Sequence, residues 1–160
     1  NVSGAEGYTI YGSKSGKKMK KIKDMPYGVK SYTAKKLAKG TYYKFVIVAY
    51  RYSKGEKHTI ATSTEVHCTT KGGKYGNPQK LIYNKKKVNV KLGKKLKLKP
   101  KYKSDKKVKK YTPKFRYESS NASIAKVDKK GRIKGVAKGK CYIYIYTQNG
   151  LYKRVRVSVK

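Results

Sequence analysis

Apolar and polar residues alternate along most of the chain. Val88, Val90 and Leu92 are separated by the polar residues Asn89 and Lys91. The same period of two recurs over residues 95–99, 142–146 and 154–159. Because successive side chains of a strand point to opposite faces, this period indicates strands with one face in a core and the other in water.

Turn-forming residues separate these runs at short intervals. The pair Asn149-Gly150 stands between two alternating runs and is a strong hairpin signal. Other turns are expected at Gly12, Gly40, Gly93 and Gly131. No segment shows a helical stripe. Many short strands joined by regular turns predict an all-β fold made of sandwiches or barrels.

The segment 71–79 interrupts the pattern, because it is rich in glycine and contains Pro78. Such a composition is typical of a linker. We therefore expect two modules, residues 1–70 and 80–160. Residues 1–70 carry 14 basic and 4 acidic side chains, whereas residues 71–160 carry 30 and 3, so most of the charge belongs to the second module.

Three runs of the first module have the order and spacing of known strands. Residues 7–11, 45–50 and 63–70 are predicted to be strands, and Leu37 precedes Tyr43 by six residues. This half resembles a fibronectin type III domain. The resemblance implies that Tyr43 is a corner tyrosine, with its hydroxyl bonded to nearby backbone.

The first two strands of that family have no counterpart here, and the chain contains no tryptophan. Without them we expect the inner face formed by Tyr8, Ile10, Phe45 and Ile47 to be bare. Such a sandwich should not be stable alone. We expect the missing strands to lie outside this segment or to come from another chain.

The second half carries a more specific pattern. Residues 115–121 lead into a Ser-Ser-Asn turn, and residues 124–128 and 131–139 follow with glycines at their turns. This half resembles the bacterial immunoglobulin-like domain, group 2, of invasin- and intimin-type surface proteins. Tyr117 stands where that family more often has tryptophan. Both resemblances imply tandem immunoglobulin-like β-sandwiches in an extracellular, cell-surface or secreted protein; signals for export are expected outside residues 1–160.

The chain is strongly basic, with 44 Lys and Arg against 7 Asp and Glu and a formal net charge of +37. Such a field attracts anions. Lysine far outnumbers arginine. Because the lysine ammonium is a hydrated point charge, this excess favours loose attraction over specific recognition. We expect anionic polymers such as teichoic acid or an acidic glycan to bind, and nucleic acid only non-specifically. The candidate anion-binding residues are Lys85, Lys86, Lys87, Lys95, Lys97, Lys99 and Lys101. The alternative is a solvated edge whose lysines prevent strand pairing.

A second candidate surface is aromatic. If Ile143 and Ile145 face inward, the neighbouring tyrosines and the arginines of the following strand face outward together. The residues concerned are Tyr142, Tyr144, Tyr146, Arg154 and Arg156. This lattice is a candidate ligand or protein interface, a self-supporting sheet surface, or a contact with a neighbouring module.

Nothing in the sequence indicates catalysis. No nucleophile motif, phosphate-binding loop or close pair of carboxylates is present, so we expect no enzyme activity and no cofactor. His67 and Cys68 are adjacent on a predicted strand and point to opposite faces, so no metal site is expected. Cys68 and Cys141 lie in different modules and are expected to be buried free thiols.

These observations favour a non-catalytic extracellular module of a bacterial cell-surface protein, used in adhesion or cell-wall association through its basic surface and flanked by other domains of a larger chain. Two alternatives stay open. One is a purely structural spacer or stalk; the other is an accessory binding module of a secreted hydrolase. No run of 18 apolar residues is present, so no membrane-spanning helix is expected.

Overall fold

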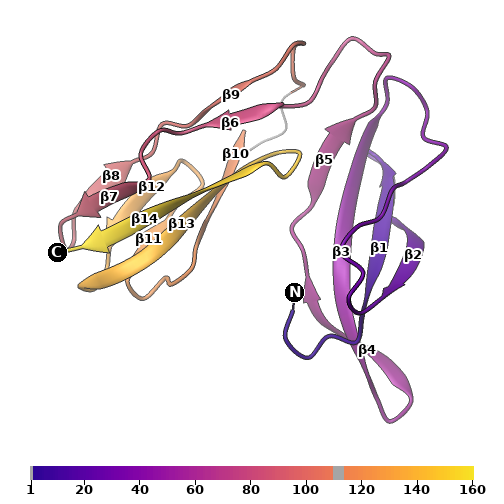
Figure 1. Ribbon diagram of the computed structural model, residues 1–160, viewed down its shortest axis with the longest axis horizontal. Helices are drawn as coiled ribbons and strands as arrows, with labels where there is room; N and C mark the ends of the chain where they lie inside the picture. The colour runs from indigo at the N-terminus through magenta and orange to yellow at the C-terminus, as the bar shows by residue number, and fades with distance from the viewer. Residues whose placement is uncertain (1, 110–113) are drawn as a thin grey trace. The chain divides into compact units, whose positions relative to one another are not determined.

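The structure of the protein, a computed structural model, describes residues 2–109 and 114–160. Every regular element in these residues is a β-strand, and no helix occurs among them. This confirms the all-β fold that the alternating pattern predicts and the immunoglobulin-like class that the family resemblances imply. The chain divides into two compact units, Asn1–Lys74 and Tyr75–Lys160, which are described separately (Figure 1).

The first unit is built on one antiparallel sheet. Its strands are β1 (Gly7–Lys14), β2 (Lys20–Pro26), β3 (Tyr42–Ser53), β4 (Glu56–Thr62) and β5 (Val66–Thr69). The long strand β3 pairs with β1 on one side and with both β4 and β5 on the other. β4 and β5 are separated at Ser63, whose hydroxyl accepts a hydrogen bond from the Ile47 N–H at 2.9 Å.

One face of this sheet is apolar and only partly covered. The register sets Ile10 opposite Ile47, and Tyr8 and Phe45 flank them on the same face. These side chains line an open groove of about 530 Å³, to which the β2–β3 connection contributes Val29 and Tyr32 among others. Ile47 is 46% exposed. Within residues 2–74 all strands belong to the single sheet, but the face that the sequence predicts to be bare is so only in part, because Ile10 is buried.

The second unit is a sandwich of short strands. Its strands are β6 (Lys80–Ile82), β7 (Lys87–Val90), β8 (Lys95–Lys97), β9 (Lys101–Lys103), β10 (Phe115–Ser119), β11 (Ala125–Val127), β12 (Arg132–Gly135), β13 (Gly139–Thr147) and β14 (Tyr152–Val159). One sheet has the order β10-β13-β14-β7 and the other the order β11-β12-β8, while β6 and β9 form a separate pair. β7 runs parallel to β14.

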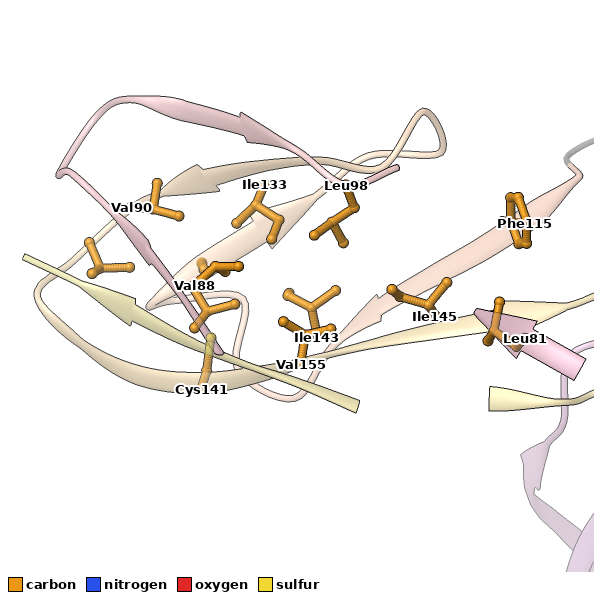
Figure 2. Close-up of a cluster of buried hydrophobic side chains, with 13 residues drawn as sticks. Leu81, Val88, Val90, Leu98, Phe115, Ile133, Cys141, Ile143, Ile145 and Val155 are labelled. Carbon is orange, nitrogen blue, oxygen red and sulfur yellow. The ribbon is translucent and has the colours of Figure 1, made fainter. Parts of the chain in front are cut away.

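The core of the second unit lies between its sheets. Ile133 of β12 and Leu98, just after β8, face Ile143 of β13 and Val155 of β14 (Figure 2). All four are nearly inaccessible to water. Alternate residues of β13 and β14 therefore bury their apolar side chains, as the period of two predicts, and the intervening side chains point to the outer faces.

Leu92 departs from the expected alternation. β7 ends at Val90, and Leu92 is 49% exposed. The chain is already turning there, because Gly93 has a φ of 72° and the Leu92 N–H donates to the Lys160 carbonyl at 2.8 Å. The period-two pattern of the sequence thus extends past the end of the strand.

Candidate anion-binding surface

The pairing of β7 with β14 creates a basic row on the outer face of the four-stranded sheet. Lys87 is the parallel partner of Arg156, and Arg156 is the antiparallel partner of Tyr142 on β13. Val88 and Val157, which neighbour them in sequence, are buried in the core. Because side chains alternate along a strand, Lys87, Arg156 and Tyr142 form a row across three strands on the water-facing side.

Two adjoining hollows lie along this row. The first, of about 690 Å³, has the basic lining residues Lys85, Lys87, Lys140, Arg156 and Lys160. The second, of about 540 Å³, is lined by Lys85, Lys86, Lys153 and Arg154 together with Tyr83 and Tyr142. Lys85 lines both hollows, and no carboxylate is among the described residues that line either one. We call these eight cationic side chains the β14–β7 face; Lys86 and Lys153 line the second hollow but have the strand parity of the buried Val88 and Ile145, so they are not part of the outer row itself.

The electrostatic effect of this arrangement is cumulative. Neighbouring strands lie about 4.8 Å apart, so charges on adjacent strands are closer than the Debye length of about 8 Å at physiological ionic strength. Their fields therefore add instead of being screened from one another. The face can hold a chain of repeated anionic groups, whereas a single small anion would engage only part of it.

The predicted tyrosine–arginine lattice forms on the same sheet, but its members differ in role. The Arg154 guanidinium lies over the Tyr142 ring at 4.5 Å, and both residues line the second hollow. Tyr144 and Tyr146 instead pack against Tyr152, with ring centroids 5.9 to 6.3 Å apart. Burial raises the pKa of Tyr146. This half of the lattice is occupied by contacts within the sheet.

Arg116 completes the aromatic half of the lattice. Its guanidinium lies 4.3 Å from the Tyr146 ring centroid, and its Nε atom lies 3.1 Å from a Glu118 carboxylate oxygen. One of the few acidic groups of the second unit is thus paired with this arginine. No carboxylate is among the described residues that line the hollows of the β14–β7 face, further along the sheet.

The structure separates the seven predicted anion-binding lysines into groups. Lys85, Lys86 and Lys87 belong to the β14–β7 face. Lys95 and Lys97 lie on β8 in the other sheet, opposite Lys134 and Arg132 of β12. β8 ends at Lys97, so exposed Lys99 does not continue that strand, and Lys101 pairs with Ile82 in the β6–β9 ribbon. They do not form one continuous row.

The residues assigned structural roles lie in packed positions. The buried Tyr43 hydroxyl accepts a hydrogen bond from the Ala38 N–H at 3.0 Å, and Leu37 beside it is half-buried. Segment 31–33, which precedes this corner, forms no strand. Tyr117 packs against the core of the second unit, where burial, followed by the nearby Asp128 carboxylate, raises its pKa to about 12.

Sequence reasoning missed three cationic members of the β14–β7 face: Lys140, Lys153 and Lys160. Lys140 shares its parity with Tyr142 and Tyr144, so the alternation of β13 could have placed it on the outer face. What no local pattern signals is that β7 lies beside β14, because that pairing joins segments about 70 residues apart.

The described residues offer no other evident chemistry. They include no cluster of three or more His, Cys, Asp or Glu that could hold a metal ion. Cys68 and Cys141 are free, Cys141 being buried and Cys68 only partly so, and burial raises the pKa of both thiols. None of the described segments forms a helix with the length and apolar character needed to span a bilayer.

The fold and surface are those of an immunoglobulin-like module with a strongly basic outer face. Residues 81–157 match the family described as bacterial Ig-like domain (group 2). This supports the resemblance seen in the second half; the fibronectin type III resemblance of the first half has no such match. None of the curated proteins compared with the chain matches it.

Two solved structures are similar to the chain at low identity. One is titled "Crystal structure of the S-layer protein rSbsC(31-844)", with 18% identity, a TM-score of 0.44 and coverage of 100% of this chain. The other is titled "Structure of surface layer protein SbsC, domains 1-6", with 17% identity, a TM-score of 0.42 and 99% coverage. The chain spans 21% of each of those chains.

Proposed function

We propose that the protein is a non-catalytic extracellular module that attaches to anionic polymers through its β14–β7 face. The observation that carries the proposal is the gathering of eight cationic side chains around two adjoining hollows whose described linings contain no carboxylate. The match of residues 81–157 to the bacterial Ig-like domain supports a surface location. In this proposal the module also spaces neighbouring domains of a larger chain.

Most cationic side chains of the β14–β7 face are lysines, and this composition favours one class of ligand, polymers with repeated anionic groups. An ammonium group is a point charge that attracts phosphate or carboxylate without fixing its orientation. A polymer with anionic groups at repeated spacing, such as teichoic acid or an acidic glycan, gains from each contact by releasing counterions. Nucleic acid would bind by the same mechanism, without sequence preference.

The test compares binding of the wild-type protein to purified Gram-positive cell wall, with and without its teichoic acid, over a series of salt concentrations. The variant Lys85→Gln/Lys87→Gln/Arg156→Gln removes three charges from the face. A matched control, Lys17→Gln/Lys18→Gln/Lys35→Gln, removes three charges from exposed positions of the first unit.

We expect wild-type binding to require the wall anion and to fall steeply with salt. On linear polyphosphate, the slope of log affinity against log salt should become shallower by about 2 in the face variant, from about 0.7 per lost contact. The control should keep the wild-type slope. Equal losses of binding in both variants would show that only the total charge of the protein matters. Absence of binding at physiological salt would indicate that the protein is only a structural spacer.

A further inference from the structure

The opposite side of the second unit presents another row of like charges. On the three-stranded sheet, Lys126 of β11 is the cross-strand partner of Lys134 of β12, and Lys134 is the partner of Lys95 of β8. Lys97 lies opposite Arg132 in the same way. The alternate residues Ala125 and Ile133 are fully buried, so these lysines point outward. We call Lys95, Lys97, Lys126 and Lys134 the β12 face.

In the part of the chain that the structure describes, the four lysines of the β12 face have no acidic partner. Asp128, the nearby carboxylate, accepts hydrogen bonds from the Arg132 guanidinium at 2.6 Å and from two backbone N–H groups. Among the described residues, no carboxylate lies within ion-pair distance of the four lysines. Like charges placed directly opposite on adjacent strands destabilise a sheet. An external polyanion would relieve this repulsion.

The two basic faces lie on opposite sides of one hydrophobic core. Ile133 from the β12 side packs in the same cluster as Ile143 and Val155 from the β14 side (Figure 2). Packed sheets are about 10 Å apart, and the outward side chains on both sides roughly double the separation of the charges. That separation exceeds the Debye length of about 8 Å. Away from β8, whose Leu96 also lines the first hollow, a polymer bound on one face therefore does little to screen or repel a polymer on the other.

We propose that the second unit binds two anionic polymer strands at once, one on each face, and thereby cross-bridges them. The inference rests on the proposed function for the β14–β7 face and adds a second, independent surface of the same ligand class. The module is then a cross-linker within an anionic matrix and not only an attachment to it.

The experiment uses two populations of beads with different fluorophores, each coated with linear polyphosphate, and the full chain at increasing concentration. Mixed aggregates report bridging, and protein retained on beads of one colour reports simple binding. The variants are Lys85→Gln/Lys87→Gln/Arg156→Gln on the β14–β7 face, Lys95→Gln/Lys126→Gln/Lys134→Gln on the β12 face, and the three-lysine control in the first unit. Sedimentation of the free protein checks that it is monomeric, and circular dichroism checks that each variant is folded.

We expect the wild type and the control to bridge the beads. As the protein concentration rises, the amount of mixed aggregate should reach a maximum and then decline, because excess protein coats the beads of each colour separately. Each face variant should lose bridging at least tenfold while still binding beads of one colour. Wild-type binding without mixed aggregates would overturn the bridging inference and leave the proposed function standing. Persistent bridging by the β12-face variant would also overturn it. Absence of any bead binding would instead reject the proposed function itself.

Discussion

Gly131 occupies the turn between β11 and β12, where a side chain would meet two separate obstacles. Its φ is 73°, in the left-handed region that glycine adopts without penalty. A Cβ atom at this position would also lie 2.7 Å from Cζ and 2.8 Å from the hydroxyl oxygen of Tyr117. Tyr117 is partly buried and packs against the core, so moving its ring aside would disturb that packing. We therefore predict that Gly131→Ala destabilises the second unit.

The two contributions can be separated because the chain provides a matched glycine. Gly93 has a φ of 72°, but a Cβ atom added there would have no other atom within 4 Å, so Gly93→Ala incurs only the backbone cost. That cost is about 1–2 kcal/mol. Overpacking against the Tyr117 ring adds about 1–3 kcal/mol. Gly131→Ala should thus cost about 2–5 kcal/mol, and in a Tyr117→Leu background only the backbone cost should remain.

Hydrogen exchange measured by mass spectrometry reports the second unit by itself, through the protected amides of β13. A loss of about 1.4 kcal/mol accelerates exchange roughly tenfold. Protection should fall about 5- to 30-fold in Gly93→Ala and by at least about 30-fold, up to a few thousandfold, in Gly131→Ala. Equal losses at the two glycines, or an undiminished Gly131→Ala effect in the Tyr117→Leu background, would refute the contact with the ring.

Two further predictions concern the first unit. Tyr43→Phe removes the acceptor of the Ala38 N–H and should cost about 1 kcal/mol in denaturant unfolding, whereas Tyr27→Phe, at a 55% exposed position, should have no measurable effect. Asp24 is bonded to Lys21, Lys57 and Thr9, and these contacts hold its pKa well below its usual value of 3.8. Because its folded pKa is lowered, its contribution is present above about pH 4 and is lost as the pH falls further. Asp24→Asn should therefore destabilise the unit at pH 7 and flatten the acid limb of its stability curve; an unchanged acid limb, or the same change in Glu6→Gln, would contradict the assignment.

Much of the fold follows from local patterns. The period of two places Ile143, Val155 and Val157 inward, and the Asn149-Gly150 pair lies at the hairpin between β13 and β14. The corner in which the Tyr43 hydroxyl accepts a hydrogen bond from backbone was instead implied by the resemblance of the first half to a known family. These predictions hold because strand periodicity, turn chemistry and corner contacts involve residues close together in sequence. Leu92 shows the limit, since a pattern alone does not mark where a strand stops.

The grouping of charges is a different matter. The sequence by itself determined that the chain is all-β, that it is strongly basic and which side chains of each strand face water. Only the tertiary structure placed β7 beside β14, joining Lys85 and Lys87 to Arg156, and moved Lys95 and Lys97 to the opposite sheet. The physical reason is that side-chain alternation is a property of one strand, whereas the neighbour of a strand depends on how distant segments pack their apolar faces. A lysine is accepted at any exposed position, so its presence carries no information about which strand will lie next to it.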